Sequence, residues 1–381
     1  MAGHGVVSAD SHMTEPADLW EKRLDRRFRD RSPKVIESPD SSASHLFVAE
    51  GAPPMAVAAG FAAGRSGKEL AEMMKQGYEA ARPSGWDPVE RIKDQELDGV
   101  DAEILYPTLG MATFAMTDPE LQRACFTTYN NWLAEFCGHD PKRLYGIGLI
   151  SLEDIDDAVE DLARISKQGM RGAMIWAAPP EDRPYDDRLY DRFWQAASEH
   201  QLPLSLHIVT GRGRHAAQIR DALGNWGGRV ANAGVLYTVL IHEIQNTLAV
   251  MVFGGVFERF PELRVVSAES DSGWLPHFLY RMDHAYEKYV EMMLDPPPLR
   301  PSDYMRRQVW ATFQDDPVGP ANHAFFDAAD RLMWASDFPH ADSTFPESRA
   351  WIEKNFADVP DDVTRKIVYE NAVALYRMDI A

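Results

Sequence analysis

The stretch Val6–Pro16, VVSADSHMTEP, ends an apolar run with an acid and an imidazole. Asp10 and His12 are two residues apart, so on a β-strand both side chains point to the same face. Burying such groups costs free energy unless each has a partner. An acid and an imidazole on one face at a strand end therefore predict a metal site.

Seven further apolar runs rich in Val, Ile and Leu follow along the chain, each succeeded by a segment with helical spacing. They are DAEILYPT (101–108), LYGIGLISL (144–152), RGAMIWA (171–177), LPLSLHIV (202–209), LRVVSAES (263–270), RQVWATF (307–313) and RLMWASDF (331–338). With VVSADSH they make eight strand and helix units, and no Gly-rich phosphate fingerprint follows the first strand. This pattern predicts an α/β fold in which residues 1–381 form a single (β/α)8 TIM barrel. It is less typical of an open doubly wound sheet.

One segment is too long for a minimal barrel unit. From about Asp40 to Pro88 the chain begins polar and becomes helix-like in KELAEMMKQGYEAA (68–81). Segments that follow barrel strands lie on the face where barrel enzymes place their sites. We interpret 40–88 as an insertion after the first strand and a candidate lid over an apolar substrate; a subunit contact or plain surface decoration explains it equally well.

Composition restricts the partners and the compartment. The 39 Lys and Arg against 59 Asp and Glu give a net charge of −20, which repels nucleic acid and anionic membrane surfaces. No apolar run approaches the ~20 residues that a membrane span requires. The two cysteines, Cys125 and Cys137, and the lack of a charged-then-apolar leader predict no disulfide scaffold and no secretory route. We expect a cytoplasmic protein with a small-molecule substrate.

Polar residues end four of the predicted strands, and in a barrel these ends converge on one face. A buried set of three carboxylates would repel itself without a cation. The predicted metal ligands are Asp10, His12, His207, Glu269 and Asp337.

Other residues are candidates for the metal's surroundings or for substrate binding. Glu15 could turn back to the metal or cap the helix in TEPADLW. His340 lies three residues after Asp337, close enough to ligate or to carry a proton, and His242 is placed at the start of a helix. Arg212 and Arg214, in GRGRHAA, could meet a phosphate or carboxylate, although a surface loop explains this segment as well.

With these residues in view, the chain resembles the amidohydrolase-related family, in the branch that includes aminocarboxymuconate-semialdehyde decarboxylase. The matching stretches are ADSHMTEP (9–16), GVDAEILYPT (99–108), SLHIV (205–209), FGGVFERFPELRVVSAES (253–270), WASDFPH (334–340) and NAVALY (371–376). The resemblance implies a (β/α)8 barrel, a metal site at its C-terminal face and a homodimer.

Two positions depart from this family. Its first strand usually supplies His-x-His, where this chain has Asp10 and His12, and its sixth strand usually supplies a histidine, where this chain has Glu269. Oxygen-rich donor sets suit iron or manganese better than a single zinc hydrolase site. In these departures the chain resembles the TIM-barrel nonheme diiron monooxygenases of platensimycin and platencin biosynthesis, which implies two iron ions, dioxygen, an external reductant and a coenzyme A-linked substrate.

Three functions follow from these observations. The leading hypothesis is a diiron monooxygenase of secondary metabolism, which hydroxylates an apolar substrate with electrons from an unidentified donor. The alternative is a metal-dependent hydrolase or decarboxylase that acts on a small carboxylate or ester with Zn or Mn. The third is a noncatalytic binding barrel with a structural ion.

Overall fold

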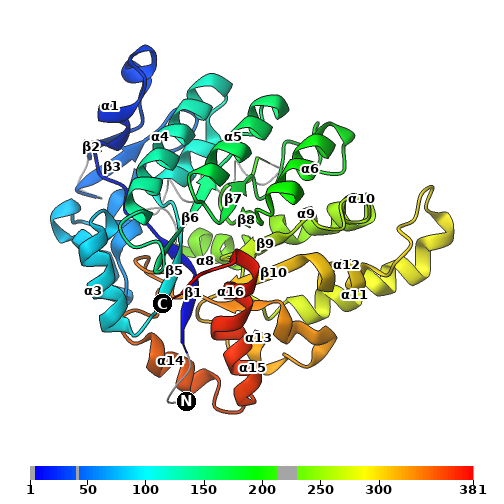
Figure 1. Cartoon of the computed structure of the whole chain (residues 1–381). Helices are drawn as coiled ribbons and strands as arrows, with labels where there is room; N and C mark the ends of the chain where they lie inside the picture. Colours follow the sequence, from blue (N-terminus) through cyan, green and yellow to red (C-terminus); the bar gives the residue numbers. More distant parts are fainter. Residues whose placement is uncertain (1–4, 40–42, 213–229, 381) are drawn as a thin grey trace.

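Eight parallel strands form the centre of the molecule. The computed structural model describes residues 5–39, 43–212 and 230–380 (Figure 1). All eight predicted strands are confirmed: β1 (Val7–His12), β5 (Ala102–Tyr106), β6 (Leu144–Leu149), β7 (Gly172–Ile175), β8 (Leu204–His207), β9 (Val265–Ala268), β10 (Val309–Phe313) and β11 (Leu332–Trp334). Nearly every strand residue is buried, as expected for parallel strands that are covered on both faces.

The strands pair in chain order, from β1 through β5 to β11. The two ends of this row also meet, because the Asp337 N–H donates to the Asp10 carbonyl at 3.0 Å and the His12 N–H donates to the Phe338 carbonyl at 2.6 Å. The sheet is therefore a nearly closed barrel, and the (β/α)8 prediction is confirmed.

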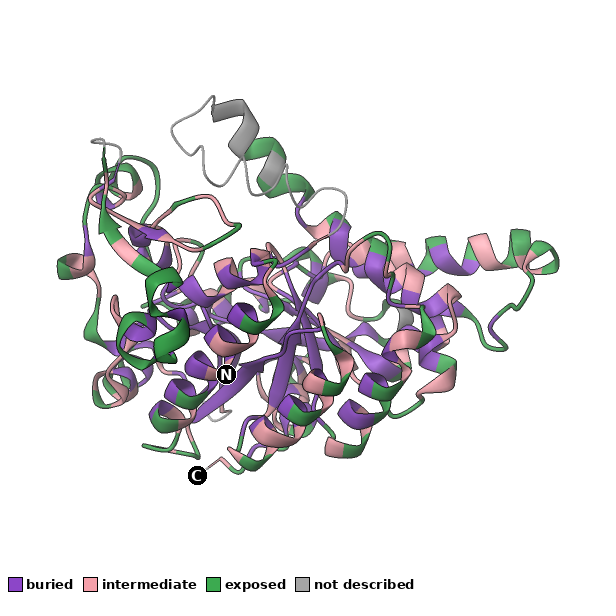
Figure 2. Ribbon diagram, turned by 90° about the horizontal axis from the view of Figure 1, so that it is seen from above, coloured by how far each residue is buried: buried purple, intermediate pink, exposed green. Residues whose placement is uncertain are grey.

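Helices surround the strands, with buried inner faces and exposed outer faces (Figure 2). The larger helices of this layer are α3 (Pro88–Asp98), α4 (Pro119–Cys137), α5 (Ile155–Lys167), α6 (Asp191–His200), α9 (Ile241–Phe253), α11 (Leu275–Tyr289), α12 (Pro301–Gln308) and α14 (Ser348–Asn355). Shorter helices are α1 (Leu19–Arg23), α10 (Val256–Arg259), α13 (Val318–Ala321), α15 (Asp361–Arg365) and α16 (Asn371–Tyr376), and α8 spans Val230–Val239. Within the described residues, no helix is long and apolar enough to cross a membrane.

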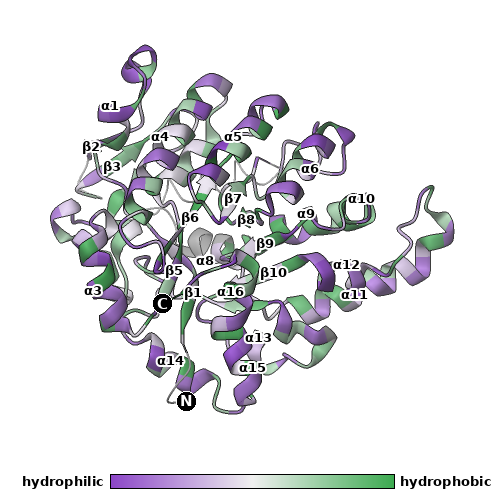
Figure 3. Ribbon diagram, in the orientation of Figure 1, coloured by the Kyte–Doolittle hydropathy of each residue, from purple (hydrophilic) through white to green (hydrophobic). Residues whose placement is uncertain are grey.

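The helix α5 illustrates how the sequence specifies this layer. The Asp154 carboxylate accepts the Asp157 N–H at 3.0 Å and so caps the first turn. Ala158, Leu162 and Ile165 then recur at helical spacing and are fully buried. Figure 3 shows both hydrophobic and hydrophilic residues along this helix, as expected for a helix with one buried and one exposed face.

The segment between β1 and β5 carries the additional elements. A small antiparallel sheet, β2 (Lys34–Glu37), β3 (His45–Val48) and β4 (Met55–Ala56), begins before Asp40. The helix-like pattern over 68–81 forms only α2 (Gly67–Met73), followed by the 3-10 turn η3 (Tyr78–Ala80). The segment reaches the C-terminal face of the barrel, where the Ala63 N–H donates to the Pro339 carbonyl at 2.9 Å. Its role as a lid remains a prediction.

Candidate metal centre

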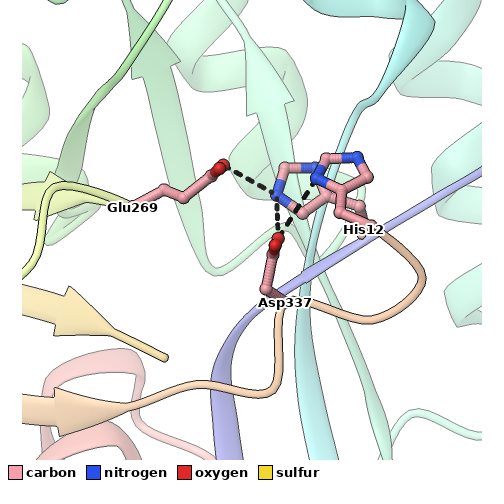
Figure 4. A group of neighbouring side chains, drawn as sticks. His12, Glu269 and Asp337 are labelled. Carbon is pink, nitrogen blue, oxygen red and sulfur yellow. Dashed lines mark ion pairs between the residues drawn. The ribbon is translucent and has the colours of Figure 1, made fainter. Parts of the chain in front are cut away.

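Five side chains meet at the C-terminal ends of the strands. The His12 Nε2 atom lies 3.4 Å from an Asp10 oxygen, 3.5 Å from a Glu269 oxygen and 3.4 Å from an Asp337 oxygen. Figure 4 shows the carboxylates of Glu269 and Asp337 converging on the same nitrogen of the His12 ring. The His207 Nε2 atom lies 3.1 Å from Glu269 and 3.8 Å from Asp10. The structure therefore brings all five predicted ligand residues together.

The backbone turns sharply where two of these carboxylates leave their strands. Glu269 follows β9 with a φ of 50°, and Asp337 lies just beyond β11 with a φ of 55°. Left-handed backbone at a residue other than glycine costs about 1–3 kcal/mol and is found where the surrounding structure enforces it. Both residues adopt it at the point where their carboxylates turn toward His12.

Several donor atoms of this cluster are buried without a hydrogen-bond partner. Within the described part of the chain these include Asp10 Oδ1, His12 Nε2, His207 Nε2 and both carboxylate oxygens of Asp337. An unsatisfied buried polar atom costs about 1–3 kcal/mol, and more when it is charged. A divalent cation would satisfy the whole group at once, and imidazole nitrogens with carboxylate oxygens are suitable ligands for one.

Hydrogen bonds orient the two histidine rings for this role. The Nδ1 atom of His12 lies 2.7 Å from the Pro107 carbonyl, and that of His207 lies 3.1 Å from the Ile208 carbonyl. A carbonyl only accepts, so each Nδ1 carries the proton and donates it. In the neutral form of each ring, Nε2 then carries the lone pair, which points toward the carboxylates as a metal ligand requires.

Thr312 connects two carboxylate residues of the cluster, Asp10 and Glu269, and the sequence did not point to it. Its hydroxyl donates to Asp10 Oδ2 at 2.9 Å and accepts the Glu269 N–H at 2.8 Å. Asp10 Oδ2 is thereby fixed, and Oδ1 is the atom left for the cation. The sequence signal was a hydroxyl residue near the end of the apolar strand VWATF.

The cluster attracts positive charge. Burial lowers the pKa of His12 and of His207, but the carboxylates of Asp10 and Glu269 outweigh burial and raise both pKa values to about 10. Burial and the nearby Glu269 also raise the pKa of Asp337 well above its usual value. In each case a bound proton reduces the excess of negative charge, which a metal cation would do more completely.

His340 adjoins the centre, as predicted. Its ring stacks on His12 with a centroid distance of 3.9 Å, and its Nδ1 lies 3.1 Å from Asp337 Oδ1. The opposite ring nitrogen, Nε2, is 2.8 Å from the Thr108 hydroxyl. His340 is one of four residues, with His12, Glu269 and Asp337, whose donor atoms all lie within 4.8 Å of one another.

Two other candidates lie outside the cluster. The Glu15 carboxylate accepts the N–H groups of Leu109 and Gly110, both at 2.9 Å, so it caps the 3-10 helix η5 (Leu109–Ala115) rather than the helix in TEPADLW. His242 is the second residue of α9, and its side chain is exposed. Asp10, His12 and His207 form a second group of donors within 4.8 Å of one another, and neither Glu15 nor His242 contributes to this group or to the one that contains His340, among the described residues.

Of the two arginines predicted to bind substrate, Arg212 is engaged by other groups of the protein. The Arg212 guanidinium donates to Glu153 at 2.9 Å and to the Met116 carbonyl at 3.1 Å, and it packs over the Trp176 ring at 5.5 Å. Arg214 lies outside the described residues.

Comparison with known proteins identifies the class. The family model described as Amidohydrolase matches residues 45–378, so the chain belongs to the amidohydrolase family. The gamma-resorcylate decarboxylase of Polaromonas sp. strain JS666 is 22% identical over 300 residues, 76% of this chain and 87% of the relative.

Solved structures agree on the fold. An amidohydrolase from Mycobacterium avium subsp. paratuberculosis K-10 superposes with a TM-score of 0.78 at 22% identity, covering 99% of this chain and 100% of that one. The 5-carboxyvanillate decarboxylase of Novosphingobium aromaticivorans DSM 12444, complexed with manganese and 4-hydroxy-3-methoxy-5-nitrobenzoic acid, has a TM-score of 0.68 at 19% identity and covers 98% of this chain and 96% of that one.

These findings correct the leading functional hypothesis. The similar proteins from Polaromonas and Novosphingobium are decarboxylases, which are lyases, so the prediction of an oxidoreductase was wrong. They give no support to two iron ions, dioxygen, a reductant or a coenzyme A substrate. The error arose because Asp10 and Glu269 were taken to indicate iron, whereas carboxylate oxygen is an equally good ligand for manganese. The resemblance to the amidohydrolase-related family is confirmed.

Proposed function

We propose that this protein is a metal-dependent decarboxylase that removes carbon dioxide from a small carboxylic acid without an oxidant. The observation that carries the proposal is the set of buried, unpartnered donor atoms on Asp10, His12, His207 and Asp337. Family membership and the decarboxylase relative support it.

The cation is proposed to be a single divalent ion, with manganese as the first choice. Three carboxylates and two imidazoles would hold it, a donor set that suits Mn²⁺. When bound, it would supply Lewis acidity that draws the substrate carboxylate to the centre and stabilises negative charge as carbon dioxide leaves.

The protein itself must deliver a proton. Loss of carbon dioxide breaks a carbon–carbon bond and leaves the electron pair on the substrate carbon, which then takes up a proton. Asp337 and His340, whose facing atoms are 3.1 Å apart, are positioned to share that proton. The Thr108 hydroxyl holds the other ring nitrogen of His340 and so fixes the ring orientation.

The test uses protein loaded with Mn²⁺ and kept free of oxygen and reductant. Release of carbon dioxide from a panel of aryl and alkenyl carboxylic acids is measured, together with metal content by elemental mass spectrometry. We expect His207→Ala to lose both the cation and activity, and the exposed His242→Ala to retain both. Failure of the fully loaded wild-type protein to decarboxylate any acid of the panel would overturn the proposal.

A further inference from the structure

An apolar cavity lies beside the proposed metal centre. It has a volume of about 70 Å³, opens to solvent, and lies between the loop before β4, the 3-10 helix η5 and the segment after β8. Its lining residues are Ala52, Pro53, Pro54, Met55, Thr108, Met111, Ala112, Phe114, Ala115, Val209, Thr210 and Gly211.

Two lining residues connect this cavity to the centre. The Thr108 hydroxyl is 2.8 Å from the Nε2 atom of His340. The Thr210 hydroxyl donates to the carbonyl of His207, again at 2.8 Å. The wall of the cavity therefore contacts His340 beside the cluster and the backbone of His207.

The cavity offers a ligand almost no polar side-chain group. Among the described lining residues, only Thr108 and Thr210 carry side-chain hydroxyls, and both hydroxyls are already hydrogen-bonded. The Thr210 hydroxyl also accepts the Ala177 N–H at 3.0 Å. No charged side chain lines it, and Pro53 and Pro54 have no N–H to donate. Arg212, which follows the lining residue Gly211, is held by Glu153 and the Met116 carbonyl.

We infer that this cavity binds the hydrocarbon part of the substrate, so that the substrate class is a carboxylic acid with an apolar body. The inference rests on the proposed function for its carboxylate end, which meets the cation. A charged group or hydroxyl on the substrate body would lose its hydrogen bonds to water and find no hydrogen-bond partner in the cavity, which is unfavourable.

Met111 is the residue best placed to decide this preference. It is half-buried in η5 and packs against the core, and its flexible thioether can adapt to different hydrocarbon shapes. Replacing it with glutamine keeps the length of the side chain and introduces an amide. Replacing it with leucine keeps the wall apolar and serves as the matched control.

The experiment measures binding of unreactive acids to Mn²⁺-loaded protein by calorimetry. The probes are benzoate, 4-ethylbenzoate, 4-butylbenzoate and 4-carboxybenzoate. Because burial of one methylene group is worth about fourfold in an equilibrium constant, we expect Kd to fall by up to about fourfold for each added methylene. The added carboxyl group of 4-carboxybenzoate should not lower Kd relative to benzoate. Met111→Gln should weaken binding of 4-butylbenzoate about tenfold more than binding of benzoate, whereas Met111→Leu should weaken both alike.

The outcomes separate this inference from the proposed function. Equal binding of benzoate and 4-butylbenzoate, or tight binding of 4-carboxybenzoate, would overturn the inference even if the protein decarboxylates hydroxylated aryl acids. A preserved dependence on alkyl length in a protein that decarboxylates nothing would support the apolar cavity and reject the reaction. Circular dichroism of both Met111 variants verifies that they fold.

Discussion

Two buried carboxylates, Asp10 in β1 and Glu15 three residues after this strand, lie close together in the sequence but are bonded in different ways in the structure. Asp10 has one oxygen fixed by Thr312 and the other unpartnered beside His12. Glu15 has both oxygens satisfied by backbone N–H groups of η5. The comparison teaches that the bonding of each oxygen atom, rather than burial or distance along the chain, distinguishes a candidate metal ligand from a helix cap.

The largest expected effect is at Asp10. Asp10→Ala should lose the bound cation and reduce decarboxylation about a thousandfold, because a ligand is gone. In the presence of chelator its Tm should fall below that of the wild type, because Thr312 loses its acceptor and His12 and His207 lose a carboxylate that stabilises their protonated rings. Metal analysis and thermal unfolding measure the two effects. A variant that keeps a full equivalent of cation would show that Asp10 is not a ligand.

The opposite result is expected at Glu15. Glu15→Ala leaves the Leu109 and Gly110 N–H groups without an acceptor, so at about pH 5 we expect a loss of about 2–4 kcal/mol in the free energy of unfolding. Its metal content should match that of the wild type. Urea unfolding and elemental analysis of the same preparation test both statements, and loss of the cation would place Glu15 at the centre after all.

The pH dependence of stability sharpens the contrast. Burial raises the pKa of Glu15 from 4.5 to about 7, although its backbone hydrogen bonds lower it. Between these values the unfolded chain loses the proton while the folded protein retains it, so the free energy of unfolding should fall as the pH rises. The total decrease in the free energy of unfolding between pH 4.5 and about 7 is about 3 kcal/mol. Below pH 4.5 Glu15 is protonated in both states and causes no further change. Urea unfolding across this range should show a shallower decline for Glu15→Gln than for the wild type; equal slopes would contradict the assignment.

The smallest expected effect is at Thr312. Thr312→Val removes the hydroxyl that orients Asp10 and Glu269, so we expect Mn²⁺ affinity to fall about tenfold with little change in folding. Thr364→Val is the matched control, because the Thr364 hydroxyl is buried with no hydrogen-bond partner among the described residues. Competition with a chelator measures the affinity. Equal affinities in the two variants would limit Thr312 to a structural role.

The strands and their polar ends could be predicted because both are local properties of the sequence. Runs such as LPLSLHIV and RLMWASDF show where a buried strand ends, and barrel topology then brings His207 and Asp337 together. The conformation of Glu15 could not be predicted in this way, since its partners, Leu109 and Gly110, lie in η5, far along the chain. The pairing of Arg212 with Glu153 is equally nonlocal.

The reaction was harder to predict than the ligands. Asp10 and Glu269 report that the donors are oxygen-rich, but this property is shared by iron and manganese sites and does not specify the chemistry. The contribution of Thr312 also depends on a contact between the first and seventh strands of the barrel.

The meeting of β1 with the segment after β11 has a consequence for the order of events in the cell. Asp10 and His12 lie far before Asp337 in the chain and are synthesised well before it, yet the backbones of Asp10 and Asp337 are hydrogen-bonded to each other. A growing chain therefore cannot assemble the complete donor set before Asp337 has been synthesised. Loading of the cation should follow barrel closure, and a bound ion would then join the first and last strands of the barrel.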